Sequence, residues 1–280
     1  MTTSAKLLAD VVNPQGNRLT IYEATFHRFV LAEVNTHRSH SRSSASSRAI
    51  PVEKMLRRAI ESPAFPISWT SEQPGMQGGT ELEGQDLFDA QLLLQEIAEH
   101  TIEEISAYLD RHPDKSTRLH KSLLNRPMEW FQYHTVIIGA TDDGWANLFA
   151  QRATEHSPLA QPELRAVVDI MWDLYKASTP SPLGYGEWVT PYIQPHEVFR
   201  SEEDKRRVSA ARCARVSYLN HDRSDPDIDS DLGVFAKLTS ARPMHAAPLE
   251  FVARPLNPQG KPMGNFTGYR QFRHIVQGLA

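Results

Sequence analysis

Apolar residues recur at helical spacing over two long stretches of the chain. In the first stretch, 86–111, they are Leu87, Leu94, Ile97, Ile102, Ile105 and Leu109. Glu and Gln fill the positions between them, so the pattern predicts an amphipathic helix that ends before Pro113. The second stretch, 162–178, carries proline in its first turn and closes at Thr179 and Pro180, which predicts another helix.

Shorter patterns supply the remaining expected elements. Alternating and β-branched residues predict two strands within 18–34, at 19–22 and 29–31, and a further strand at 249–253. Further helices are predicted at 116–124, 143–154, 201–215, 231–242 and 269–276, whereas 130–141 fits either a helix or a strand. Proline and glycine mark loops at 62–84 and 181–195. Because helices and strands mix on both sides of 181–195, we expect one α/β (α+β) domain spanning 1–280.

Composition limits the function classes. The chain has 280 residues, 40% apolar residues and a formal charge of −4, which is ordinary for a globular protein. The slight acidity disfavours a general nucleic-acid binder, so direct binding of nucleic acid is not expected. No apolar run approaches the ~20 residues that a membrane-spanning helix requires, and no signal-peptide core is visible. The single cysteine, Cys213, excludes an internal disulfide and fits the cytoplasm.

Segment 36–48 has the densest set of anion-binding groups in the sequence. It places three arginines, two histidines and six serines in thirteen residues, without an acid. Arginine forks match phosphate oxygens and serine hydroxyls add short donors, so a site for a phosphorylated small molecule is the first interpretation. A solvated polar loop is the alternative.

Other chemical groups are less specific. His37 and His40 are three residues apart, which would place both imidazoles on one face of a helix, but no recognised metal pattern completes a zinc site. Arg152 lies beside Leu148 and Phe149 on a predicted helix, so partial burial with a partner is plausible. A glycine-rich Rossmann turn and a P-loop are both missing from the sequence.

Three motifs resemble those of flavin-dependent thymidylate synthases. The family motif Arg-His-Arg, two residues, Ser, four residues, Ser, one residue, Arg is matched by His37, Arg38, Ser41, Ser46 and Arg48. A second segment, a helix-ending arginine followed by Ala-Gln-x-Glu, is similar to Arg152 and 160–165. A third, Ala-Arg-Val-Ser followed by a His-to-Glu segment, is similar to 214–217 and 245–250. The third motif is N-terminal in typical members and C-terminal here, which indicates a circularly permuted relative of the kind associated with phage genomes.

The resemblance implies a mixed sheet flanked by long helices, in a homotetramer whose subunits share active sites. The implied reaction transfers a one-carbon unit from methylenetetrahydrofolate to C5 of a pyrimidine deoxynucleotide monophosphate, dUMP above all, with FAD and NADPH. It would take place in the cytoplasm, that of the bacterial host if a phage encodes the chain. By similarity, Arg152 and His245 are catalytic. The substrate-binding residues would be Ser46, Arg48, Arg126 and Arg152, and the flavin-binding residues would be His37, Arg38, Ser41, Ser217 and Glu250. No metal is implied.

The chemistry agrees with these residue types. A cation fixed at the edge of the uracil ring stabilises negative charge at N3 and makes C5 electron-rich. Departures from the family pattern keep other functions open, because Thr36 replaces the first arginine, while Ala247 and Phe251 replace the usual Ser or Thr and His. Arg42 is near enough in sequence to offset the missing cation. The alternatives are a hydroxymethylase or methylase of dUMP or dCMP for modified phage DNA, and a catalytically inactive nucleotide-binding relative.

Overall fold

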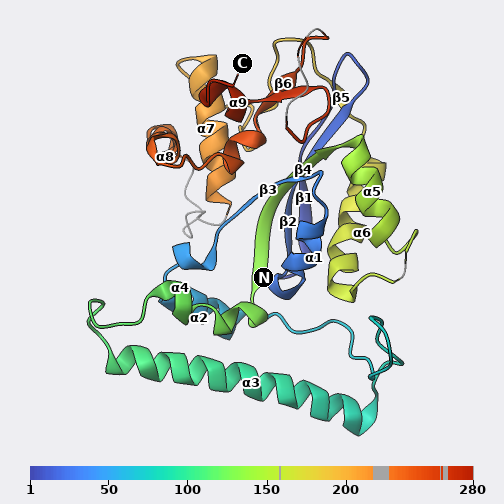
Figure 1. Cartoon of the computed structure of the whole chain (residues 1–280), viewed down its shortest axis with the longest axis vertical. Coiled ribbons are helices and arrows are strands. Elements are labelled where there is room, and N and C mark those ends of the chain that lie inside the picture. The colour runs from blue at the N-terminus through green and yellow to red at the C-terminus, as the bar shows by residue number, and fades with distance from the viewer. Residues whose placement is uncertain (158, 217–226, 259, 261–263, 280) are drawn as a thin grey trace.

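A mixed sheet lies at the centre of the computed structural model, which describes residues 1–157, 159–216, 227–258, 260 and 264–279. The five strands have the order β3-β4-β2-β1-β5 (Figure 1). They are β1 (Ser4–Val12), β2 (Arg18–His27), β3 (Ser41–Ser44), β4 (Tyr133–Thr141) and β5 (Ser181–Pro182). All neighbours are antiparallel except β1 and β5, which are parallel, so the predicted mixed α/β fold is confirmed.

The central strands β2 and β4 send alternate side chains into two different cores. Tyr22, Ala24 and Phe26 of β2 belong to one hydrophobic cluster, whereas Leu19 and Ile21 belong to another. Successive side chains of a strand point to opposite faces, so a strand covered on both sides needs an almost continuous apolar run. β4 has such a run at 136–140, whereas Thr20, Glu23 and Thr25 interrupt the apolar residues of β2.

One face of the sheet is covered by α1 (Leu31–Thr36), α5 (Asp142–Arg152) and α6 (Pro162–Ala177), which lie together in Figure 1. Trp145 of α5 is fully buried against this face, and its indole donates a hydrogen bond to the Thr20 carbonyl at 3.2 Å. Leu164, Val167 and Val168 line the inner side of α6. The apolar spacing that predicted α6 therefore marks its packing face.

The opposite face is covered by the C-terminal elements. They are α7 (Glu202–Arg215), α8 (Ile228–Ser240), the 3-10 helix η4 (Ala247–Glu250), β6 (Ala253–Pro255), β7 (Tyr269–Gln271) and α9 (Phe272–Val276). Cys213, Phe251 and Phe266 pack on Leu19 and Ile21 of the sheet. Burial raises the pKa of the Cys213 thiol, so this cysteine is a core residue.

A separate layer lies beyond the end of the sheet. The 28-residue helix α3 (Gly84–Arg111) crosses below α2 (Val52–Glu61) and α4 (Lys121–Leu124) in Figure 1. Its C-terminal half packs on α2 and on η3 (Pro127–Phe131), where Ile105 is buried with Met55 and Met128. Its N-terminal half leaves Phe88, Leu93 and Ile97 about half exposed. Among the described residues, no helix is both long and apolar enough to cross a membrane.

Several sequence predictions were wrong because tertiary contacts decided them. The stretch 29–31 is helical, since η1 (Arg28–Val30) and α1 follow β2 directly. Of the predicted strand at 249–253, the first two residues belong to η4 and only Ala253 is in a strand, β6, while the predicted helix at 269–276 begins as β7. The predicted helix at 116–124 shortens to α4, and β1 was not predicted at all. The ambiguous 130–141 is mainly β4, which pairs with β2 over its whole length.

Candidate functional site

The first half of the 36–48 segment folds back into the protein. α1 ends at Thr36, so His37 and His40 lie in a turn after the helix, and the predicted shared helical face is wrong. Both imidazoles are nevertheless buried, with ring centroids 6.2 Å apart. The His40 ring also packs edge-on against Trp145 at 4.6 Å. This half of the segment is a buried histidine pair on the α5 side of the sheet.

Arg152, at the end of α5, reaches this pair. Its Nε donates a hydrogen bond to His37 Nε2 at 3.2 Å. Burial, Arg152 and Arg42 lower the pKa of His37, so the imidazole stays neutral and accepts the bond at Nε2. Within the described part of the chain, the two terminal amino groups of Arg152 make no hydrogen bond. The arginine is thus oriented by one contact and keeps four N–H donors for a ligand.

His40 is the least satisfied polar group of the cluster. Neither ring nitrogen has a hydrogen-bond partner among the described residues, although the side chain is only 2% exposed. Burial, with His37 and Arg42 nearby, lowers its pKa to about 3. The imidazole is therefore neutral at physiological pH. An unpaired buried polar group usually has a functional or structural reason.

Arg42, on β3, holds the turn in place. One terminal nitrogen of Arg42 donates to the carbonyls of Val34 at 3.0 Å and His37 at 2.7 Å, the last turn of α1 and the residue after it. Burial lowers the pKa of Arg42, partly opposed by the charge of Glu250. Thr36 is exposed and donates to the Glu33 carbonyl. Arg42 therefore uses one of its terminal nitrogens on the backbone of the turn, and its part in offsetting the arginine missing at Thr36 stays a prediction.

The C-terminal elements reach the same strand from the other side. The Ser41 hydroxyl accepts hydrogen bonds from Gln271 Nε2 at 3.2 Å and Asn265 Nδ2 at 3.4 Å. Glu250 is 9% exposed and forms an ion pair with Arg273. The segment 36–44 is therefore clamped between α5 and the C-terminal elements. Arg42, Asn265, Gln271 and Arg273 were not expected from the sequence, because no local motif marks a residue that acts through packing.

The other expected site residues do not join this cluster. Ser46 and Arg48 lie at η2 (Ser47–Ala49), past the end of β3, and are exposed. Arg126 is exposed and pairs with Glu129 at 3.1 Å. Arg38 and His245 are exposed, and neither makes a side-chain hydrogen bond within the described part. Ser217 lies outside the described residues.

Metal ligands are not clustered in the described part of the chain: no group of three or more His, Cys, Asp or Glu side chains that could hold an ion occurs there.

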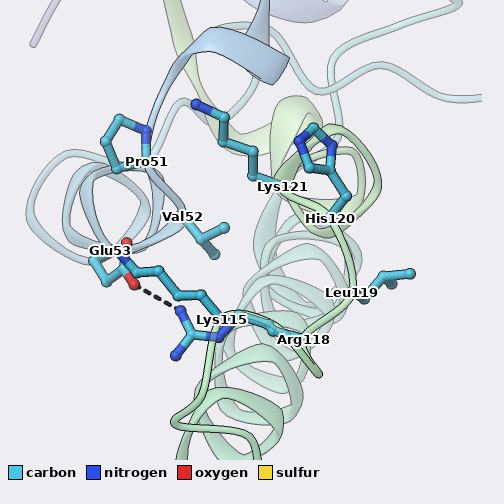
Figure 2. A pocket seen from close by; sticks show the side chains of 8 residues that line it. All are labelled: Pro51, Val52, Glu53, Lys115, Arg118, Leu119, His120 and Lys121. Atoms are coloured by element: carbon cyan, nitrogen blue, oxygen red, sulfur yellow. Dashed lines mark hydrogen bonds and ion pairs between the residues drawn. The ribbon is translucent and has the colours of Figure 1, made fainter.

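A pocket of about 330 Å³ opens beside η2, between α2 and the residues that lead into α4 (Figure 2). Lys115, Arg118, His120 and Lys121 line one side of it. Lys115, Arg118 and Lys121 were not expected as site residues, because their spacing matches no motif.

Comparisons with known proteins give no family. No protein-family model matches this chain, and no curated protein matches it. Solved structures similar to it include two crystal structures of the UMP/dUMP methylase PolB from Streptomyces cacaoi. The one bound with 5-Br UMP has 14% identity, a TM-score of 0.43, and coverage of 56% of this chain and 68% of that chain. The one bound with 5-Br dUMP has 15% identity, a TM-score of 0.44, and coverage of 56% and 66%. Similarity of this extent does not establish a function, so the functional argument depends on this chain's own residues.

Proposed function

We propose that this chain is a flavin-dependent enzyme that transfers a one-carbon unit from methylenetetrahydrofolate to C5 of a pyrimidine deoxynucleotide, with dUMP as the first substrate. The observation that carries the proposal is the convergence of three segments distant in sequence. Arg152 bonds His37 at 3.2 Å, and Ser41 bonds Gln271 at 3.2 Å, in the C-terminal elements that also hold Glu250. Each segment contains one of the motifs that resemble the flavin-dependent synthases.

The buried half of the site fits a flavin by its donor chemistry. The flavin ring presents nitrogen and carbonyl acceptors, to which a neutral imidazole can donate through its N–H. His40 and His274 add buried ring nitrogens without partners in the described part. When bound, FAD would carry the hydride from NADPH to the transferred carbon. His37, Arg38, Ser41, Glu250 and, outside the described residues, Ser217 remain the proposed flavin-binding residues.

Arg152 would act on the pyrimidine. Its guanidinium is held by one hydrogen bond at Nε, which leaves the terminal amino groups to face O2 and N3 of the base. A fixed cation there stabilises charge at N3 and raises electron density at C5, in a site that excludes water. His245 is exposed in the single chain. Its proposed catalytic role therefore requires that a bound ligand or a second subunit covers it.

We infer a homotetramer with shared sites, and the exposed residues support this part of the proposal. Ser46, Arg48 and Arg126, proposed to hold the nucleotide, lie on the surface and make no contact with Arg152 by hydrogen bond or ion pair. Phe88, Leu93 and Ile97 of α3 are about half exposed, and exposed apolar surface of this kind is typical of a contact with a partner. A second copy lying on α3 would bring its own residues to this side of the molecule and complete the site.

The deciding experiment is mass spectrometry of the products from dUMP and from dCMP, each with methylenetetrahydrofolate, NADPH and FAD. Addition of a methyl group to dUMP is the expected result. A hydroxymethyl product, or turnover of dCMP, would instead favour a hydroxymethylase or methylase that supplies nucleotides for modified DNA. Purified protein should also be yellow or take up FAD. A colourless protein that FAD cannot reconstitute would favour the alternative function, a catalytically inactive nucleotide-binding protein. Thr36, which replaces an arginine of the family motif, is the observation that favours this alternative.

A further inference from the structure

The pocket beside η2 is built from basic side chains. Lys115, Arg118 and Lys121 line it together with Glu53, while Val52 and Leu119 supply apolar surface. Figure 2 shows Arg118 reaching Glu53, with Lys121 extending toward the segment that holds Pro51. The residues come from two parts of the chain, 51–53 and 115–121, which only the fold brings together.

The charges of this pocket do not cancel. Arg118 is neutralised by Glu53 at 2.9 Å and is fixed further by the His112 carbonyl at 3.0 Å. Lys121 donates to the neutral carbonyl of Ala49 at 3.2 Å, so two of its three donors remain. Lys115 makes no ion pair among the described residues. Two ammonium groups therefore keep their charge beside an apolar wall.

A second basic pocket adjoins the first on the other side of α2. It has a volume of about 410 Å³, shares Pro51 and Glu53 with the first, and contains Lys54, Arg57 and Arg58. None of these three cations makes an ion pair within the described part of the chain. Burial lowers the pKa of Arg58, and burial together with Arg58 lowers that of Lys54. An anion between them would relieve both the repulsion and the loss of hydration.

The combined surface has a marked excess of positive charge. Six cations and two carboxylates line the two pockets. The carboxylates are Glu53, which is paired with Arg118, and Glu61. The whole chain, by contrast, has a formal charge of −4. Guanidinium forks bind phosphate in a bidentate way and ammonium groups bind it as point charges. Val52 and Leu119 offer the apolar contact that a flat ring needs.

We propose that these two adjoining pockets bind a cosubstrate with two separated phosphate-bearing parts, and that this cosubstrate is the nicotinamide dinucleotide phosphate of the reaction proposed above. The identity of the ligand rests on the proposed function, whereas the site rests on the cations and cavities alone. The first pocket is tied to the segment 47–50, because Lys121 donates to the Ala49 carbonyl and Asn125 donates to the carbonyls of Ser47 and Ile50 at 2.7 and 2.9 Å. The cosubstrate would therefore lie next to the segment that holds Arg48.

The test measures equilibrium binding of NADPH to the full chain by calorimetry, without pyrimidine nucleotide. One variant changes the first pocket, Lys115→Gln with Lys121→Gln, and another changes the second, Lys54→Gln with Arg58→Gln. Lys205→Gln with Lys237→Gln removes two charges elsewhere and is the matched control. Each pocket variant should weaken NADPH binding by about tenfold to a hundredfold, since each removes charge-assisted hydrogen bonds. The control should bind as the unchanged chain does.

Further arms separate this inference from the proposed function. NADH, inorganic pyrophosphate and tetrahydrofolate are titrated alongside, and one pocket variant should abolish the preference for NADPH over NADH. The inference is overturned if the unchanged chain does not bind NADPH, if the control weakens equally, or if only tetrahydrofolate binding responds to the variants. If NADPH binding depends on both pockets but no pyrimidine is turned over, the site stands and the proposed function fails. Circular dichroism of each variant establishes that it is folded.

Discussion

The two halves of the 36–48 segment differ in almost every physical respect. In the first half three side chains are buried and the three others are exposed: His37, His40 and Ser41 are each less than 10% exposed and contact either α5 or the C-terminal elements. In the second half, Ser46 and Arg48 are exposed and precede Pro51 and Glu53, which line both basic pockets. One continuous motif thus serves two environments, a closed one prepared within the single chain and an open one.

This difference indicates how the site divides its tasks. In the closed half the bonds from Arg152 to His37 and from Gln271 to Ser41 already exist in the single chain, so these side chains are oriented before any ligand arrives. In the open half the arginines have hydrated side chains, and a ligand or a second subunit must supply their partners. We therefore expect changes in the closed half to affect catalysis, and changes in the open half to affect affinity and assembly.

The largest expected effect is in the closed half. Arg152→Ala removes the cation proposed to stabilise charge at N3, so turnover should fall about 10²–10³-fold. Flavin should remain bound, which visible absorbance of the purified variant measures. Arg152→Lys keeps the charge but loses the planar fork, and should recover only part of the activity. Normal turnover by the alanine variant would remove Arg152 from the reaction.

Assembly offers the next test. Leu93→Glu with Ile97→Glu places two charges on the half-exposed apolar side of α3, and should convert the proposed oligomer into monomers with little activity. Gln95→Glu, on the same helix, adds charge at an already polar position and should leave assembly unchanged. Sedimentation velocity measures the oligomeric state of both variants. A chain that is monomeric and active before any substitution would refute the shared site.

In the open half, Arg48→Ala should weaken the affinity for dUMP by about tenfold to a hundredfold, because it removes a charge-assisted contact to phosphate. The rate at saturating nucleotide should change much less than in Arg152→Ala. Lys237→Ala, on the exposed side of α8, serves as the control. Calorimetry with dUMP measures the affinity, and an unchanged value would separate Arg48 from the nucleotide phosphate.

The sequence was informative where one local signal dominates. α6 begins with proline and buries one regular apolar stripe, and its bounds agree with the prediction within one residue. The segment 29–31 looked like a strand because its residues are apolar and branched, yet it turns into helix to pack Val30 and Val34 into the core under α5. β7 pairs with β6, a contact that no reading of 269–276 alone reveals.

The candidate site was predictable only in part, for the same reason. The motif residues His37, Ser41 and Arg152 could be selected from the sequence, since the resemblance depends on their types and order. The role of Arg42 could not, because an arginine that holds backbone carbonyls has the same sequence signature as one that holds phosphate. The basic pockets could not be predicted either, because the fold brings 51–58 together with 115–121.

The smallest expected effect concerns His40, in the closed half. In the unfolded chain its pKa is about 6.5, whereas burial lowers the folded value to about 3. Between these values the unfolded state binds a proton that the folded state does not. Folding stability should therefore fall with decreasing pH across this window, by at most about 1.4 kcal/mol per pH unit from this group.

His40→Leu removes this titration and the two unpaired nitrogens together. At pH 7 the variant should be about as stable as the unchanged chain, because no hydrogen bond is lost. At pH 4.5 it should be the more stable of the two, with a shallower pH slope in urea denaturation. His134, whose pKa is also lowered to about 3, adds the same pH dependence to the stability of both proteins and cancels from the comparison.

His100→Leu, at an exposed position on α3, is the control. Parallel slopes for His40→Leu and the unchanged chain would mean that this imidazole is not sealed from water, and that the closed half of the site is open as well.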